Sequence, residues 1–351
     1  MPGVIYVSAI TQGEAGLRYI LDTPETNVEM LSIELSNTVG EDKILNRIKI
    51  SLYSPTSDIS DTDITNLRLY VDTGSLGTYE VADVLISGPV TQPSGMTVIF
   101  SNITGFTILE NSITNLLLTI EHKTLTNGER LQAIVMPQWV EYYGIDTIYT
   151  DTGYGSTGYG VVKEVPGDLI ITSITNGESL LKYMLSSATA EVELMQLRLS
   201  ATRGEAKIVS EIQISLDYVQ GIVDADITNI QLLIDRGISG TLDGSDIVVA
   251  NYSGNPVSGI VTLSNISGLT INSNSATNVL VVLRHITLNY GDRITATIKT
   301  NWITHYGNYT IYTDTSLGAN CDAVPKEVPG DIIVSSITPV SYTHLTLPTK
   351  A

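Results

Sequence analysis

Histidine and cysteine are the side chains best suited to acid–base, nucleophilic and metal chemistry, and this chain holds few of them. They are His122, His285, His305, His344 and Cys321. No histidine pair has the H-E-x-x-H spacing of a metalloprotease, and no G-x-S-x-G, P-loop or G-x-G-x-x-G stretch occurs. Cys321 has no matched histidine nearby, so we expect an unreactive thiol on a surface loop. The sequence therefore predicts that the protein is not an enzyme.

Acidic side chains outnumber basic ones. The 351 residues include 37 Asp and Glu against 18 Lys and Arg, which gives a net charge of −19. Because carboxylates are so abundant, a pair at glycosidase spacing is expected by chance and does not indicate that reaction. The chain has no stripe of Lys and Arg to neutralise phosphates, so nucleic acid is not a predicted partner. No run of about 18 apolar residues occurs, so no membrane span is predicted.

Four asparagines stand in Asn-x-Ser/Thr triplets, the acceptor pattern for N-linked sugar. They are Asn102, Asn251, Asn265 and Asn308, and the first and third occupy the same position of an internal repeat. Such triplets also arise by chance in chains rich in Ser, Thr and Asn, and O-linked sugar on Ser/Thr loops is an open alternative. These asparagines are therefore candidate glycosylation sites.

An internal repeat defines the elements that position these residues. The hexapeptide Lys-Glu-Val-Pro-Gly-Asp at 163–168 recurs at 326–331. The same 163-residue spacing pairs Trp139 with Trp302, while the spacing nearer the start is 164. Repetition at a fixed period indicates one structural unit written twice. The sequence predicts two tandem domains of the same fold.

Each unit is predicted to be all-β. Runs rich in Val, Ile, Thr and Tyr alternate apolar with polar residues, as at 48–52, 67–71 and 294–298. Turn clusters separate these runs without convincing helical stripes. The pattern predicts two tandem antiparallel β-sandwiches of the immunoglobulin-like kind, plus an extra C-terminal strand. Segments 28–35 and 192–199 shift their apolar register once, which a β-bulge explains as well as a helix does.

The repeat also sets the predicted boundaries. We place the first sandwich at 1–162 and the second at 169–325, joined by a linker at 163–168 that its proline makes semi-rigid. Residues 326–339 repeat the linker and a unit's opening strand, as either a donor strand or the start of a third domain. Residues 340–351 resemble a translated sequencing adapter and are expected to be an artefactual tail, with a genuine polar tail as the alternative.

An Asp-rich hairpin follows a shared strand start in both units. Residues 224–235 and the glycine-rich loop after them resemble the D-x-D-I strand and D-x-N-x-N-G-x-x-D-x-x-D hairpin of secreted bacterial tandem repeats. Gly268-Leu269-Thr270-Ile271 fits the same immunoglobulin-like or cohesin-like family. The resemblance covers about half of each unit. It implies the sandwich fold and a secreted, multi-domain protein.

The resemblance also implies calcium at the hairpin. The matching carboxylates are Asp235, Asp243 and Asp246 in the second unit and Asp72 and Asp83 in the first. Gly237 and Ser239 stand where the family has asparagine, which puts the ligand set in doubt. Calcium needs about six oxygen ligands, so the three-carboxylate hairpin is the better candidate. An acidic turn that holds no ion is the alternative, and no other cofactor is predicted.

The function predicted from these features is structural and extracellular. Tandem sandwiches with scarce lysine and 18 tyrosines suit self-association at the cell surface. A strand at 332–338 repeats the opening strand 169–175 and can add to the sheet of a neighbouring copy. Its predicted contact residues are Ile332, Ile333, Val334 and Ile337. The chain is thus predicted to be a filament or surface-array subunit that assembles head to tail. An adhesin or glycan-binding repeat is the alternative, and a hydrolase accessory domain is a third.

Overall fold

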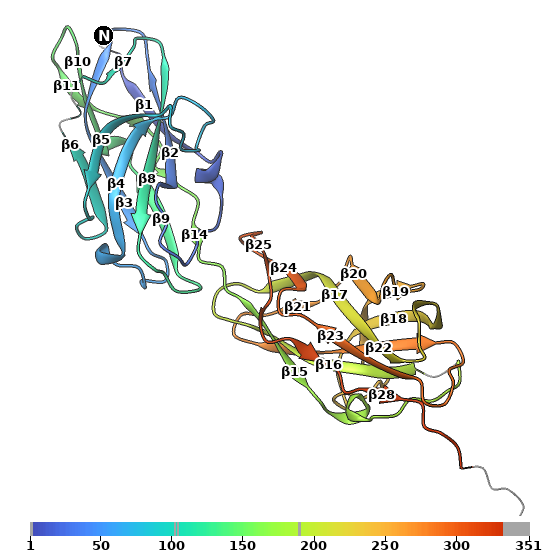
Figure 1. The fold of residues 1–351 in the computed structure, drawn as a ribbon. Helices are drawn as coiled ribbons and strands as arrows, with labels where there is room; N and C mark the ends of the chain where they lie inside the picture. The colour runs from blue at the N-terminus through green and yellow to red at the C-terminus, as the bar shows by residue number, and fades with distance from the viewer. Residues whose placement is uncertain (1–2, 102, 104, 189–190, 333–351) are drawn as a thin grey trace, which may run out of the picture.

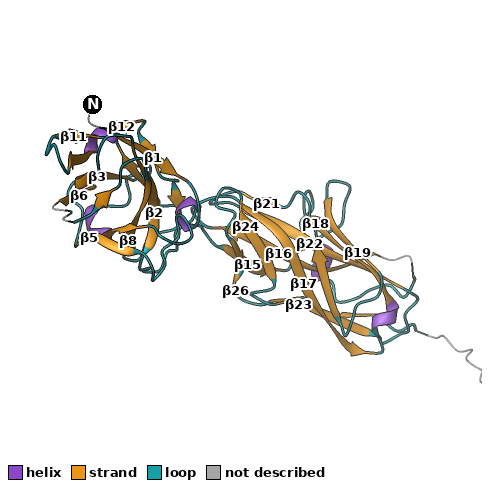
Figure 2. Ribbon diagram, turned by 90° about the horizontal axis from the view of Figure 1, so that it is seen from above, coloured by secondary structure: helices purple, strands orange, loops and turns teal. Residues whose placement is uncertain are grey.

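A computed structural model describes residues 3–101, 103, 105–188 and 191–332. The chain forms two β-sandwiches that lie end to end, and the first and last described residues lie at opposite ends of the pair (Figures 1 and 2). Within the described ranges the only helices are short 3-10 turns, and none is long and apolar enough to cross a membrane. The predicted all-β fold of two tandem sandwiches is confirmed.

The first sandwich pairs two mainly antiparallel sheets. One has the strand order β12-β1-β2-β8-β4-β5, and the other has the order β11-β10-β3-β9-β13 with β6 and β7 on β3 and β14 on β9. The bounds are β1 (Ile5–Ile10), β2 (Val28–Asn37), β3 (Lys43–Tyr53), β4 (Ile64–Val71), β5 (Val84–Val90), β6 (Thr97–Ser101), β7 (Thr107–Ile108), β8 (Ile113–His122), β9 (Arg130–Val135), β10 (Val140–Gly144), β11 (Thr150–Thr152), β12 (Tyr154–Gly155), β13 (Gly158–Tyr159) and β14 (Lys163–Glu164).

The second sandwich repeats this topology strand for strand. Its sheets have the orders β19-β18-β22-β16-β15-β26 and β25-β24-β17-β23-β27, with β20 and β21 on β17 and β28 on β23. The bounds are β15 (Leu169–Ile174), β16 (Glu191–Ala201), β17 (Lys207–Gln220), β18 (Ile227–Ile234), β19 (Ile247–Ser253), β20 (Ile260–Ser264), β21 (Thr270–Ile271), β22 (Ala276–His285), β23 (Arg293–Ile298), β24 (Ile303–Gly307), β25 (Thr313–Thr315), β26 (Leu317–Gly318), β27 (Cys321–Asp322) and β28 (Lys326–Glu327). The 3-10 turns are η1 (Glu14–Gly16), η2 (Asp61–Asp63), η3 (Pro137–Trp139), η4 (Gly177–Leu180) and η5 (Asp224–Asp226).

Alternating burial builds each core. Strand β9 buries Leu131, Ala133 and Val135 and leaves the residues between them half-buried, because successive side chains of a strand point to opposite faces. Strand β8 is buried on both faces over its middle, since Leu117 packs on the outer side against Ala15 and Tyr70. Ala15 belongs to η1, and Tyr79 of the first Asp-rich hairpin packs against the same cluster, so η1 and the hairpin cover the outer face of this sheet.

The register shifts that the sequence contains are β-bulges. The pairing of β2 with β8 slips between Glu29 and Leu31, and that of β16 with β22 slips between Glu193 and Met195. An extra residue in one strand of an antiparallel pair moves the apolar set by one position without ending the strand. Trp139 and Trp302 also lie at equivalent points, directly before β10 and directly before β24.

The repeated hexapeptide begins inside each sandwich. Lys163 and Glu164 form β14 on β9, and Val165 is fully buried in the first core. Only residues 166–168 then separate the first core from β15. The expectation for Cys321 is wrong, because the thiol lies in β27 and is fully buried. Burial raises its pKa to about 11.

Candidate functional site: the joint between the sandwiches

A loop at 309–312, here the second docking loop, is held from inside by a buried acid. The carboxylate of Glu205 accepts hydrogen bonds from the N–H of Tyr309 at 2.7 Å, from the N–H of Thr310 at 2.9 Å and from the Thr310 hydroxyl. The ammonium of Lys207 lies 3.7 Å away, and both charged side chains are almost fully buried. Buried charges are stable only when paired and hydrogen-bonded. The loop therefore has a fixed backbone.

The first docking loop, 146–149, has the same anchor. The carboxylate of Glu41 accepts from the N–H of Asp146 at 3.0 Å, from the N–H of Thr147 at 3.1 Å and from the Thr147 hydroxyl at 2.6 Å. Lys43 lies 3.0 Å from the same carboxylate. The Thr147 hydroxyl and then the Lys43 ammonium hold the pKa of Glu41 at about 2. Both docking loops are thus built from equivalent residues.

Three residues at the far end of the first sandwich form its receiving face: Arg18, Tyr19 and Arg130. Tyr19 pairs with β14 at Glu164, and the Arg130 guanidinium lies 2.7 Å from the Glu164 carboxylate. The side chain of Glu164 is only 1% exposed. Strand β14 therefore fixes both the tyrosine and one arginine of this face.

The second docking loop packs on the receiving face of the first sandwich. The rings of Tyr19 and Tyr312 lie 4.8 Å apart, and the guanidiniums of Arg18 and Arg130 lie 5.2 Å and 5.6 Å from the centre of the Tyr309 ring. The Tyr309 hydroxyl donates to the Val162 carbonyl at 3.1 Å. Aromatic and cation–π contacts of this kind favour one relative orientation of the two sandwiches.

Polar contacts surround this aromatic centre. Asn127 of the first sandwich donates to the Asp168 carboxylate at 2.8 Å and to the Thr202 hydroxyl at 3.2 Å. Asp58 forms an ion pair with Arg203 across the joint. The joint therefore combines a stacked centre with hydrogen bonds and one ion pair at its edge.

A cavity of ≈ 340 Å³ lies beside the joint, with Lys163 in its wall. The Lys163 ammonium donates to the main-chain carbonyls of Glu14 at 2.8 Å and Leu17 at 2.9 Å. Burial lowers its pKa to about 8, although nearby carboxylates oppose the shift. The other polar and aromatic residues of the wall include Glu14, Glu25, Glu29, Tyr19, Tyr79 and Tyr312. The cavity thus presents tyrosine rings and carboxylates together.

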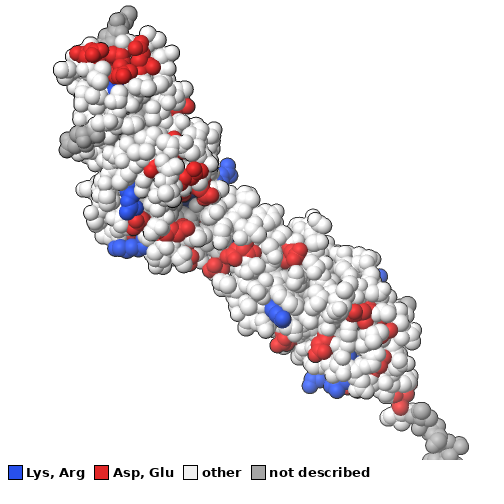
Figure 3. All heavy atoms as spheres, turned by 45° about the horizontal axis from the view of Figure 1, so that its top comes forward, with Lys and Arg blue, Asp and Glu red and all other residues white. Residues whose placement is uncertain are grey.

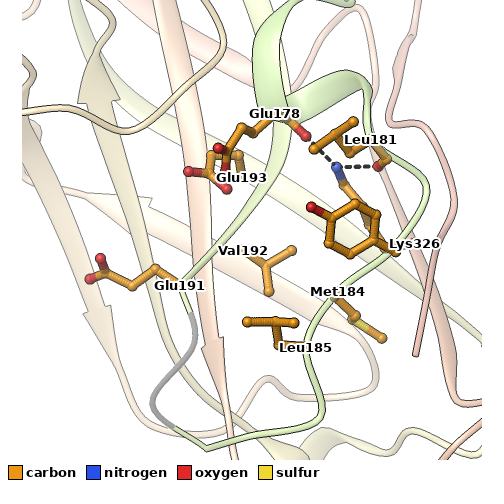
Figure 4. A pocket seen from close by; sticks show the side chains of 9 residues that line it. Glu178, Leu181, Met184, Leu185, Glu191, Val192, Glu193 and Lys326 are labelled. Atoms are coloured by element: carbon orange, nitrogen blue, oxygen red, sulfur yellow. Dashed lines mark hydrogen bonds between the residues drawn. The ribbon is translucent and has the colours of Figure 1, made fainter. Parts of the chain in front are cut away.

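The second sandwich carries a smaller counterpart of ≈ 140 Å³ around Lys326 (Figure 4). The Lys326 ammonium donates to three carbonyls, those of Glu178 at 2.9 Å, Ser179 at 3.1 Å and Leu181 at 2.6 Å. Burial lowers its pKa to about 8 as well. All three ammonium hydrogens thus have partners, and Lys326 connects β28 to the segment in and just after η4.

The carboxylates of the Asp-rich hairpins accept hydrogen bonds from main-chain N–H groups of the same hairpin. In the second hairpin Asp246 accepts from the N–H of Arg236 and of Asp243, while Asp243 accepts from the N–H of Ile238 and of Ser245. Asp235 accepts from the Gly240 N–H at 2.8 Å. These bonds shape the turn, as expected for Asp in loops.

The first hairpin repeats this network with one replacement. Asp72 accepts from the Gly77 N–H at 2.6 Å, and Asp83 accepts from the N–H of Thr73 and of Glu80. Glu80 stands where the second hairpin has Asp243, and it accepts from the Ser75 N–H. Within the described ranges no three His, Cys, Asp or Glu side chains are grouped to hold a metal ion. Calcium at the Asp235–Asp243–Asp246 hairpin stays a prediction.

Of the remaining predicted residues that the structure describes, only Asn308 lies at the joint. Ile332 is 94% exposed, while Ile333, Val334 and Ile337 lie outside the described residues, as does Asn102. Asn251, Asn265 and Asn308 are exposed, and Asn308 directly precedes the second docking loop. Glycosylation at these positions stays a prediction.

Sequence reasoning missed the joint. Its central residues Arg18, Tyr19 and Tyr309 lie in loops, where hydrophobic periodicity gives no signal. A usable signal was present in the repeat, because Glu41 recurs as Glu205 and Lys43 recurs as Lys207. Charged residues that recur at buried strand ends in both units indicate the same structural role, which here is to hold the docking loop.

No protein-family model and no curated protein matches the chain. Among solved structures, the C-terminal domain of the AgI/II polypeptide BspA of Streptococcus agalactiae aligns with 93% of this chain and 100% of its own, at 12% identity and a TM-score of 0.29. The C-terminal domain of the antigen I/II-family protein AspA of Streptococcus pyogenes aligns with 93% and 100%, at 10% identity and a TM-score of 0.28. CfaE, the adhesive subunit of the CFA/I fimbria of enterotoxigenic Escherichia coli, aligns with 84% and 97%, at 11% identity and a TM-score of 0.23. Because these identities and TM-scores are low, the fold is assigned from the sheets of this chain itself. No functional residue of these proteins is assigned to this chain.

Proposed function

We propose that the chain is a non-catalytic structural segment of an extracellular or cell-surface protein, in which β-sandwiches stack end to end into a semi-rigid filament or stalk. The observation that carries this proposal is the joint. The second docking loop places Tyr309 and Tyr312 against Arg18, Tyr19 and Arg130, where a flexible tether would leave such side chains in water.

The energies of the joint support a preferred orientation. Each cation–π contact at an exposed site contributes about 0.5–1 kcal/mol, and an aromatic pair contributes a similar amount. The two arginine contacts on Tyr309 and the Tyr19–Tyr312 pair thus sum to a few kcal/mol, enough to favour the docked arrangement. The short run from Pro166 to Asp168 adds stiffness because proline fixes its own φ.

Small-angle X-ray scattering of the whole chain tests the proposal. We expect the wild type to fit one extended shape, and we expect the pair of substitutions Tyr309→Ala and Tyr312→Ala to broaden the distribution of shapes. Tyr149→Ala, in the first docking loop, is the matched control and should leave the shape distribution of a single copy unchanged, as measured in dilute solution. A wild type that is as flexible as the joint variant would contradict the proposal.

A finer form of the proposal is growth by strand donation. Residues 332–338 repeat the opening strand of a unit, and Ile332 is almost fully exposed. A strand with an apolar face and free main-chain groups can complete a sheet in another copy. Replacing Ile333 and Ile337 by Asp should then abolish filaments seen by negative-stain imaging, while circular dichroism shows both sandwiches folded. Filaments that persist would contradict strand donation.

An adhesin that binds glycans is the second candidate, and one observation favours it. The cavity at Lys163 brings three tyrosines and three carboxylates together, and sugar sites commonly combine ring stacking with acidic hydrogen-bond acceptors. The second sandwich has Leu242 where the first has Tyr79. A glycan array therefore tests the wild type beside Tyr79→Leu. Binding that the substitution removes would support the adhesin, and no binding by the wild type would contradict it.

A further inference from the structure

The two outer ends of the pair of sandwiches repeat the two halves of the joint. The first docking loop lies at the outer end of the first sandwich. The counterparts of Arg18, Tyr19 and Arg130 are Lys182, Tyr183 and Arg293, and they form a second receiving face at the outer end of the second sandwich. These two ends point away from each other (Figures 1 and 2). A single copy therefore holds each half of a second joint, and neither half has its partner among the described residues.

The free docking loop has the backbone of the docked one. Glu41 and Glu205 accept from the same two N–H groups and one hydroxyl in their respective loops. Ile148 and Ile311 both take a positive φ, of 53° and 59°. An isoleucine in this left-handed region is strained, so the shared angle reflects a loop that the surrounding structure determines. The free loop is thus preformed for docking.

The free receiving face also has the architecture of the covered one. Tyr183 pairs with β28 at Glu327, as Tyr19 pairs with β14 at Glu164. Arg293 lies 3.3 Å from the Glu327 carboxylate, as Arg130 lies beside Glu164. The side chain of Glu327 is 48% exposed, whereas that of Glu164 is 1% exposed. Among the described residues the glutamate is therefore less covered at the second face, while Arg130 and Arg293 are equally exposed, at 42%.

The chain leaves the second sandwich as it leaves the first. Asp168 is bonded by Asn127 at the joint, and Asp331 is bonded by Tyr290, the counterpart of Asn127. The counterparts of Asp58 and Arg203 are Gly221 and Val39, so the edge ion pair of the joint is not repeated. The tyrosine pair is therefore the part of the joint whose residues recur at both ends, as Tyr149 and Tyr183.

One substitution between the repeats makes the two free ends complementary in charge. Asp146 stands in the first docking loop where Tyr309 stands in the second. In the joint two guanidiniums face the Tyr309 ring, so in a second joint Lys182 and Arg293 would face the Asp146 carboxylate instead. Tyr183 and Tyr149, which are 53% and 58% exposed, would stack as Tyr19 and Tyr312 do. Figure 3 shows acidic side chains gathered at the free end of the first sandwich.

We propose that the receiving face of the second sandwich, Lys182, Tyr183 and Arg293, binds the first docking loop of a second copy of this chain. The contact joins unlike ends, so it is heterologous and leaves a free end after each addition. It rests on the proposed structural function and specifies how copies meet. In this contact, ion pairs of Asp146 with Lys182 and Arg293 stand where the internal joint has cation–π contacts. Salt should therefore weaken the contact between copies more than the internal joint.

Two variants that each disable one end test this proposal. The first is Asp146→Arg, and the second carries Lys182→Glu and Arg293→Glu. Sedimentation velocity at low salt should show concentration-dependent association of the wild type, with each variant at least about tenfold weaker. An equimolar mixture should regain association, because the intact receiving face of the first variant meets the intact loop of the second, and the two charge-reversed ends are again opposite in sign. Equal melting temperatures for all chains control for folding.

Every other outcome overturns the proposal. A wild type that stays monomeric at high concentration would contradict the contact between copies. A further unit of a longer chain would then be the next occupant of the receiving face to test. Association that both variants retain would place the contact elsewhere, and its loss on replacing Ile333 and Ile337 by Asp would point to strand donation. In these cases the scattering test of the internal joint still decides the proposed function separately.

Discussion

The two sandwiches share one frame but differ in how they satisfy buried polar groups. Lys163 donates to two carbonyls and borders the larger cavity, whereas Lys326 donates to three and borders the smaller one. Tyr142 in the first core is replaced by His305 in the second, and both are almost fully buried. The Tyr142 hydroxyl accepts from the Ile5 N–H, while neither ring nitrogen of His305 has a partner among the described residues. A duplicated fold thus keeps its backbone while its buried polar chemistry diverges.

The largest expected effect is at the buried lysines. Lys326→Ala orphans three carbonyls and Lys163→Ala orphans two, so we expect losses of about 4 and about 3 kcal/mol in the free energy of unfolding. Urea unfolding, followed by a probe in each sandwich, measures both. Lys→Met at each site controls for volume. Equal losses at the two sites would show that the third carbonyl of Lys326 contributes nothing.

The same lysines give a pH signature. Their folded pKa of about 8 lies below the ordinary value of 10.5, so above pH 8 the unfolded chain binds more protons than the native one. Stability should therefore rise as the pH increases from about 8 towards 10.5. The Lys→Met variants should lose that rise.

The next prediction compares an overpacking substitution in each of the two docking loops. A Cβ at Gly307 would lie 1.7 Å from the Glu205 carboxylate oxygen, and one at Gly144 would lie 2.0 Å from that of Glu41. We expect Gly307→Ala and Gly144→Ala each to cost about 2 kcal/mol in unfolding free energy through overpacking. Only Gly307→Ala should also broaden the scattering profile, because only its loop is docked in the monomer. If Gly144→Ala loosened the chain equally, the joint would not depend on the loop.

The second sandwich should be the more acid-sensitive of the two. Burial, with help from nearby Lys207, lowers the pKa of His305 to about 4 from 6.5. Between those values the unfolded chain binds the proton and the native chain does not, so stability falls as the pH falls. We expect a loss of about 2 kcal/mol from pH 7.5 to 5 in the second sandwich. His305→Tyr, which copies the first sandwich, should remove the slope measured by urea unfolding.

The smallest expected effect concerns the hairpins. Asp246→Ala and Asp83→Ala each release two main-chain N–H donors, at a cost of about 1 kcal/mol in unfolding free energy. Because the carboxylates already bind the backbone, we expect the same melting temperature in millimolar calcium and in chelator. A rise with calcium that Asp246→Ala removes and Asp83→Ala keeps would instead establish the predicted ion site.

The fold was largely predictable from the sequence, and the joint was not. Alternation and the repeat predicted two sandwiches, and the slip after Glu29 was consistent with the observed bulge. Cys321 was misplaced because β27 spans only two residues, too few for a pattern, yet its pairing with β23 buries the thiol. The joint depends on contacts between Arg18 and Tyr309, whose positions are set by two different sandwiches. No local pattern encodes such a contact.

The buried lysines have a further consequence for a chain that is pulled. Lys163 lies near the end of its unit, and its ammonium is bonded to carbonyls up to 149 residues earlier, close to the first strand. Tension that enters through β1 and leaves through β14 would therefore load these charged bonds first, together with the pairing of β1 on β2. Most of the unit between them would bear little of the load. In mechanical terms, the hydrogen bonds of this lysine connect the two places in the sandwich at which force enters and leaves.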